Sequence, residues 1–139
     1  MQTWNVLVFV AGAEWAPDSP SGLDRFQLDA AGQFRYENHV RGEIRSTTGT
    51  LSSEALAEIE AHLAEAAFPE VPPHDIPPGA SLVEITVADS EAARTARMDR
   101  FAAMSFPGYR ELLLRFERWT AWLRAGDTGA PPPGLDPAR

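Results

Sequence analysis

Residues 23–40, "LDRFQLDAAGQFRYENHV", decide the fold class of this 139-residue chain. Phe26 and Leu28 alternate with polar residues, and the same alternation resumes at Phe34 after a turn that contains Gly32. A period of two indicates strands with one buried face, and a short turn with glycine joins such strands into a hairpin. The stretch therefore predicts two neighbouring antiparallel strands.

Segments on both sides of this hairpin are expected to extend the same sheet. The apolar run at residues 3–11 precedes it, with both parities apolar, which is typical of a strand buried on two faces. Residues 43–51 follow the hairpin, residues 81–89 return to strand periodicity, and residues 92–99 are suited to pair with them. We predict a mainly antiparallel sheet of four to six strands.

Two segments carry a helical period instead. In residues 51–68, Leu56, Ile59 and Leu63 fall on one stripe, and Ser52 is a favourable N-cap. The proline-rich residues that follow end this helix. In residues 107–124, the apolar stripe comprises Tyr109, Leu112, Leu113, Phe116, Trp119 and Leu123. We predict an α+β fold in which two helices pack on one face of the sheet.

The chain is short enough for one domain, which we place at residues 1–125. Residues 126–139 are rich in proline and glycine and are expected to form a flexible tail.

Charge and composition narrow the classes of partner. The chain has 20 acidic and 12 basic residues and a net charge of −8, which argues against binding a nucleic-acid backbone. It has no cysteine, so it forms no disulfide or thiolate metal site, and this suits a cytoplasmic protein. No apolar run approaches the ~20 residues that cross a bilayer. The run before Ala13 resembles a short signal peptide, but no Lys or Arg precedes it.

No catalytic, metal or cofactor signature is present in the sequence. His39, His62 and His74 are not at metal-ligand spacing. His62 follows Glu58 by four residues, which is typical of a surface pair on a helix. The His74-Asp75 pair, together with the acidic loop near the N-terminus, keeps a small hydrolase as an alternative.

That acidic loop, "GAEWAPDSPSG" at residues 12–22, is the first candidate contact surface. Trp15 is expected either to cover one end of the sheet or to anchor in a pocket of a partner, flanked by Glu14 and Asp18. The prolines of the loop limit its freedom and thereby lower the entropy lost on docking.

The second candidate surface is the outer side of the last helix. At helical spacing, Leu114, Arg118 and Trp122 align opposite the core stripe, and such a row is suited to a partner or dimer contact. The alternative is that the C-terminal tail packs onto Trp122.

A resemblance adds to this interpretation. The passage "TLSSEALAEIEAHLAEAAFPEVPP" at residues 50–73, followed by "PPGASLVEITVAD" at residues 77–89, is similar to the emfourin group, small cytoplasmic inhibitors of thermolysin-like metallopeptidases. The resemblance implies that a projecting segment blocks a catalytic cleft. Glu14 or Asp18 would then bind, or pair beside, the metal of the partner.

We therefore expect a non-enzymatic protein-binding module, an inhibitor or an immunity-type protein that neutralises an enzyme or toxin. A homodimer or structural subunit that assembles through the last helix is the alternative, and the small hydrolase is a third.

Overall fold

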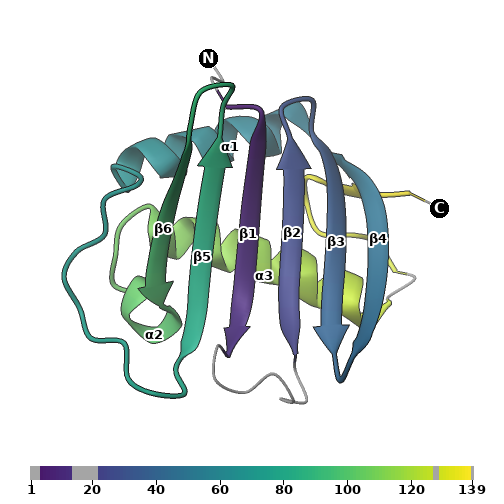
Figure 1. Cartoon of the computed structure of the whole chain (residues 1–139). Coiled ribbons are helices and arrows are strands. Elements are labelled where there is room, and N and C mark those ends of the chain that lie inside the picture. Colours follow the sequence, from purple (N-terminus) through teal and green to yellow (C-terminus); the bar gives the residue numbers. More distant parts are fainter. Residues whose placement is uncertain (1–3, 14–21, 127–128, 139) are drawn as a thin grey trace.

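The computed structural model describes residues 4–13, 22–126 and 129–138 of the chain. Within these residues, seven strands form one antiparallel sheet with the spatial order β6-β5-β1-β2-β3-β4-β7 (Figure 1). The strands are β1 (Val6–Ala13), β2 (Leu23–Asp29), β3 (Gln33–Val40), β4 (Glu43–Leu51), β5 (Ser81–Ala88), β6 (Ala93–Asp99) and β7 (Leu135–Pro137). The hairpin predicted from residues 23–40 is β2–β3.

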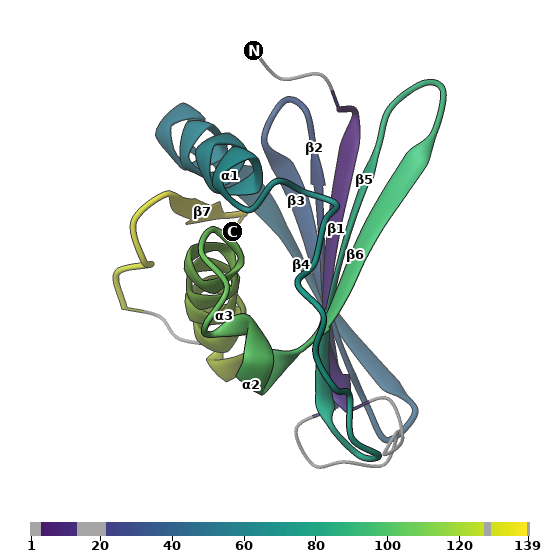
Figure 2. The same ribbon diagram turned by 90° about the vertical axis from the view of Figure 1, so that its left-hand side faces the viewer.

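Helices lie on one face of this sheet (Figure 2). α1 (Ser53–Glu65) and α3 (Tyr109–Ala125) are the two long ones, and α2 (Arg100–Ala103) is a single turn between β6 and α3. The predicted α+β class with helices on one face is confirmed. The structure differs in detail, because its described residues contain seven strands and three helices rather than four to six strands and two helices.

The two extra elements were too short to leave a periodic pattern in the sequence. β7 has three residues and α2 has four. α2 is stabilised at its start by Asp99, whose Oδ2 accepts a hydrogen bond from the Ala102 amide at 2.9 Å. Periodicity needs more residues than these elements contain.

Aromatic rings join α3 to the middle of the sheet. Phe116 stacks on Phe9 of β1, with 4.6 Å between ring centroids, and meets Phe26 of β2 edge-on at 5.5 Å. Phe26 also stacks on Phe34 of β3 and on Trp119. All six residues of the stripe predicted for α3 are buried. This contact between α3 and the three central strands is the centre of the hydrophobic core.

β1 is buried fully on one face only. Leu7 and Phe9 face the helices and are inaccessible to solvent, whereas Val6, Val8 and Val10 are half-buried on the other face. The prediction of a strand buried on both faces was therefore wrong for the second face, because none of the helices in the described residues covers it (Figure 2). Neighbouring side chains on β2 and β5 provide the partial cover.

α1 begins as its sequence predicts. Ser52 caps the helix by accepting a hydrogen bond from the Ala55 amide at 3.1 Å, and Ala55, Ile59 and Leu63 are buried. None of the helices in the described ranges is long and apolar enough to cross a membrane.

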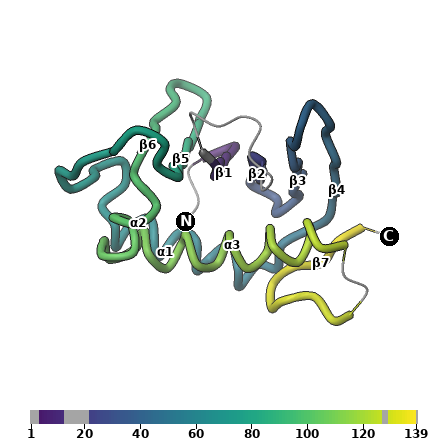
Figure 3. The backbone as a smooth tube through the Cα atoms, turned by 90° about the horizontal axis from the view of Figure 1, so that it is seen from below, coloured from purple at the N-terminus to yellow at the C-terminus, as the bar shows by residue number. Residues whose placement is uncertain are grey.

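The C-terminal segment differs from the flexible tail that its composition predicted. In its described part, residues 129–138, it returns to the sheet and adds β7 to the edge strand β4 (Figure 3). Leu135 is 5% exposed, and the Trp119 indole donates a hydrogen bond to the Pro133 carbonyl at 3.1 Å. Tertiary contacts outweigh the local preference for disorder, because the segment buries a leucine and forms backbone hydrogen bonds.

Gly108 provides a test of how closely α1 and α3 approach. It has φ +84°, and a Cβ there would lie 2.4 Å from the Ala66 nitrogen, whereas a Cβ at Gly79, with φ +77°, would meet no atom within 4 Å. We expect Gly79→Ala to cost about 1 kcal/mol of unfolding free energy through backbone strain alone, and Gly108→Ala to cost at least about 2 kcal/mol more. Urea denaturation measures both values, and equal losses would contradict the close approach.

Candidate functional site

The first predicted contact surface lies outside the described residues. Glu14, Trp15 and Asp18 all belong to the segment between β1 and β2 that the structure does not describe. Their role as partner contacts stays a prediction.

The second predicted surface is partly retained. Leu114 is 42% exposed and Arg118 is exposed, whereas Trp122 is half-buried and packs against the hydrophobic core. Residues four apart on a helix are displaced by about 40° around its axis at each step, so Trp122 turns away from Leu114 toward the side of Trp119. We refer to Leu114 and Arg118 together as the α3 ridge.

A groove between α1 and α3 borders this ridge. It has a volume of about 410 Å³ and is lined by Glu58, His62, Glu111, Leu114, Arg115, Arg118, Trp119 and Pro133.

Ion pairing in the groove differs from the pair expected on α1. Glu58 pairs with Arg115 across the two helices rather than with His62, and the Arg115 guanidinium lies 5.8 Å from the centroid of the Trp119 ring. Within the described part of the chain, Arg118 forms no ion pair. Of the two arginines that line the groove, Arg115 is therefore paired with Glu58 and Arg118 faces solvent.

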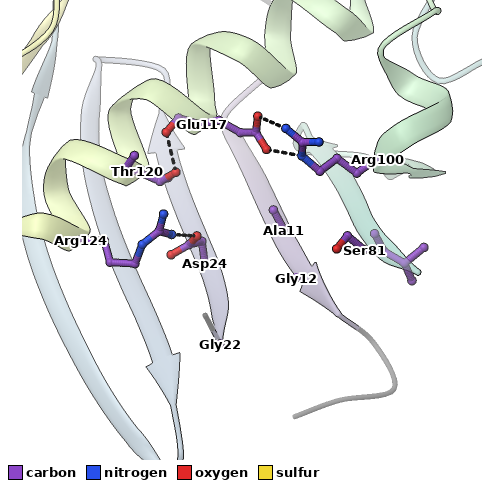
Figure 4. A pocket seen from close by; sticks show the side chains of 11 residues that line it. Ala11, Gly12, Gly22, Asp24, Ser81, Arg100, Glu117, Thr120 and Arg124 are labelled. Atoms are coloured by element: carbon purple, nitrogen blue, oxygen red, sulfur yellow. Dashed lines mark hydrogen bonds and ion pairs between the residues drawn. The ribbon is translucent and has the colours of Figure 1, made fainter. Parts of the chain in front are cut away.

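A second hollow lies on the opposite side of α3, at the ends of β1, β2 and β5 (Figure 4). This polar pocket has a volume of about 340 Å³. Its lining includes Gly12, Gly22, Asp24, Ser81, Arg100, Glu117, Thr120 and Arg124.

Asp24 is the most buried charged group of the polar pocket, at 9% exposure. Its Oδ1 accepts hydrogen bonds from the Tyr36 hydroxyl at 2.5 Å and from the Asn38 amide at 3.0 Å, and its Oδ2 pairs with Arg124. A buried carboxylate is tolerated when donors and an opposite charge satisfy its oxygens. This network ties β2 and β3 to the last turn of α3.

Arg100 and Glu117 form the other ion pair of the polar pocket. Two hydrogen bonds of 2.6 and 2.8 Å join the guanidinium to the carboxylate (Figure 4). The hydrogen bonds that Arg100 donates to Glu117 raise the pKa of Arg100. Since both side chains are about one-third exposed or more, the pair orients α2 against α3 but adds little stability.

The chemistry of the polar pocket favours a structural role. Each of its two arginines already has a carboxylate partner. Burial, together with the hydrogen bond to Asp24, raises the pKa of Tyr36, so its hydroxyl stays protonated and donates rather than acting as a base. No group of three or more histidine, aspartate or glutamate side chains among the described residues is placed to hold a metal ion.

His74 is engaged by the backbone on both sides of its ring. Its Nε2 accepts from the Asp99 amide at 3.0 Å, and its Nδ1 lies 2.9 Å from the Pro72 carbonyl, to which it donates. The neighbouring Asp75 is exposed. Because neither ring nitrogen is free, His74 cannot exchange a proton with a substrate without losing a hydrogen bond.

His39 belongs to a charged group on the face of the sheet without helices. Its Nε2 lies 3.1 Å from Glu37, which also accepts a hydrogen bond from Arg35 at 3.0 Å. These hydrogen bonds, from His39 first and then from Arg35, lower the pKa of Glu37. The arrangement is typical of side-chain pairing on a strand.

The sequence contained one overlooked signal for the polar pocket. Asp24 shares the parity of Phe26 and Leu28, so the alternation of β2 already pointed a carboxylate inward. Its partner Arg124 is 100 residues away, and no local pattern connects the two.

Comparison of the sequence with models of known protein families and with curated proteins found no match. The resemblance to the emfourin group therefore stays a prediction.

Both tyrosines of the chain, Tyr36 and Tyr109, should resist ionisation in the folded protein. Burial, and then the nearby charge of Glu70, raises the pKa of Tyr109 to about 12, and its hydroxyl donates to the Glu70 carbonyl at 2.6 Å. An unfolded tyrosine has a pKa of about 10. The protonated Tyr109 hydroxyl thus contributes stability fully below about pH 10, and this stability is lost as the pH rises toward about 12.

Ultraviolet absorbance of tyrosinate tests this expectation. Native protein should show almost no tyrosinate at pH values near 10, where urea-unfolded protein is half-ionised. Tyr36→Phe leaves Tyr109 as the single reporter. A tyrosine that titrates near pH 10 before unfolding would contradict the burial of these hydroxyls.

Proposed function

We propose that the protein is a non-enzymatic binding module of the inhibitor or immunity type, which neutralises a partner enzyme or toxin in the cytoplasm. The observation that carries the proposal is the α3 ridge, where an exposed leucine stands beside an arginine without an ion pair in the described part of the chain. The predicted loop contact at Glu14, Trp15 and Asp18 is a second element of the same proposal.

The ridge has the composition of an interface centre. Burying the exposed part of Leu114 in a partner contributes on the order of 1 kcal/mol. Arginine is among the residue types that dominate binding energies, because its guanidinium forms several hydrogen bonds at once. The groove beside the ridge adds a concave surface of mixed polarity into which a side chain of the partner fits.

The net charge of the protein indicates what kind of partner to expect. The net charge of −8 accelerates the approach of a basic protein. At the contact itself, Arg118 requires a carboxylate or carbonyl oxygen, and Leu114 requires an apolar surface. The expected partner is a basic enzyme or toxin whose surface has an apolar patch, with a carboxylate or carbonyl oxygen beside it that accepts hydrogen bonds from Arg118.

The groove between α1 and α3 and the polar pocket both favour binding over catalysis. The groove lining contains no serine, threonine, tyrosine or cysteine, and so no hydroxyl or thiol nucleophile. In the polar pocket the charged groups are paired with one another, and His74 is held by backbone groups. These features favour a binding protein over the small hydrolase.

Two substitutions that place a negative charge on the ridge test the proposal. We expect Leu114→Glu and Arg118→Glu each to weaken binding of the partner at least about 30-fold, the effect of losing a binding hot spot. Affinity capture from the native host, with identification by mass spectrometry, supplies the partner, and calorimetric titration of the purified pair gives the affinities.

Arg45→Glu is the matched control for Arg118→Glu, since Arg45 is exposed on β4 and undergoes the same change in charge away from α3. Wild-type affinity in both ridge variants would rule the ridge out as the contact. Light scattering that shows a dimer, dissociated by Leu114→Glu, would replace the inhibitor by the homodimer alternative.

A further inference from the structure

The beginning of β4 is an open edge of the sheet. β7 pairs with β4 at residues 49–51, and residues 43–47 have no strand partner on that side within the described part of the chain. The turn between β3 and β4 extends past the helices, so this end of the sheet stands clear of them (Figure 2). An open edge presents backbone N–H and C=O groups that are able to pair with another strand.

Ile44 and Ser46 direct their backbone groups toward the open side. In an antiparallel ladder the N–H and C=O of one residue face the same neighbour, and successive residues face alternate neighbours. The Thr48 carbonyl faces outward, because it accepts a hydrogen bond from the Ala138 amide next to β7 at 2.8 Å. Ile44 and Ser46 have the same parity as Thr48, so each offers a donor and an acceptor to an incoming strand.

The side chains of this edge are exposed on both faces of the sheet. Ile44 is 60% exposed and lies on the face without helices, beside its β3 partner His39. Glu43 and Arg45 are exposed on the other face, and neither forms an ion pair within the described residues. Edges that resist pairing commonly carry a proline or a bulge. This edge instead has a β-branched apolar residue between two opposite charges.

The pattern is complementary to itself about a two-fold axis through Ile44. Antiparallel pairing of two β4 strands about this axis places Ile44 opposite Ile44 of the second copy, with two backbone hydrogen bonds between them. It also places Glu43 of each copy opposite Arg45 of the other, and opposite charges in that position stabilise strand pairing. A hollow of about 200 Å³, lined by Asn38, Val40, Glu43 and Arg45, leaves room for the incoming arginine.

The neighbouring registers are disfavoured by charge or by β7. An axis through Arg45 places two arginines opposite each other, and an axis through Glu43 does the same with two carboxylates. An axis through Ser46 requires Thr48, whose carbonyl is already bonded to the Ala138 amide. A strand that matches this edge reads glutamate, apolar residue, arginine, which is the order that residues 43–45 of a second copy supply.

We propose that two copies of the chain form a dimer by antiparallel pairing of residues 43–47 of β4, so that the two sheets become continuous. The inference does not rest on the proposed function, because none of these contacts involves α3. One strand pair is a small interface, and each copy has a net charge of −8. The dimer is therefore expected to be weak, with a dissociation constant between about 10 µM and 1 mM.

Charge substitutions on β4 test the pairing. Sedimentation velocity of the full chain in about 0.15 M salt, at protein concentrations from about 10 µM to 1 mM, should show a shift from monomer to dimer. Glu43→Arg and Arg45→Glu each place like charges opposite one another at two positions of the dimer. Each should weaken dimerisation at least about tenfold.

Two combinations of these variants test the register. The double variant Glu43→Arg/Arg45→Glu again has opposite charges across the strands and should dimerise as wild type does. An equimolar mixture of the two single variants should form a mixed dimer, although neither variant dimerises well alone. Glu91→Arg makes the same change in charge at an exposed residue between β5 and β6, and as the matched control it should leave dimerisation unchanged.

Wild-type protein that stays monomeric at about 1 mM would overturn the proposal. So would a dimer that both single variants retain, or a double variant and a mixture that both stay monomeric while circular dichroism shows folded protein. Leu114→Glu leaves β4 unchanged and should not dissociate this dimer. Dissociation by Leu114→Glu, with the β4 variants still dimeric, would assign the contact to α3 instead.

Discussion

Packing of Phe116 against Phe9 and Phe26 determines how α3 is rotated about its own axis. The ring stacks on β1 at 4.6 Å and meets β2 edge-on at 5.5 Å, while Trp119 stacks on the same Phe26 one turn later. Aromatic rings are large and have restricted geometries, so this contact allows little rotation of the helix. This aromatic contact therefore also determines which way the remaining sides of α3 face.

Three different environments follow from that single orientation. One side of α3 directs Glu117 and Arg124 to the polar pocket, where both are paired. The opposite side directs Arg115 to Glu58 and Trp119 to the C-terminal segment. The side that remains is the α3 ridge. Arginines that face the protein are neutralised by carboxylates, and Arg118 faces solvent, which is why we place the partner contact there.

Part of each edge of the sheet is covered by another segment of the chain. The loop after α1 reaches β6, where His74 accepts the Asp99 amide and the Arg94 guanidinium lies over the Phe68 ring at 5.8 Å. At the other edge, β7 pairs with the last three residues of β4. Covering strand edges protects a sheet from unwanted pairing with other chains. β7 covers only the end of β4, and residues 43–47 of β4 have no strand partner on that side in the described part of the chain.

The sequence by itself determined the fold class, the β2–β3 hairpin, the N-cap of α1 and the buried stripe of α3, because each depends on periodicity and capping among neighbouring residues. Only the tertiary structure decided that Asp24 meets Arg124, that Glu58 pairs with Arg115, and that the proline-rich segment adds β7 to the sheet. These contacts join residues far apart in the chain, and they form because burial and hydrogen bonding between packed elements outweigh the local preferences that a sequence pattern records.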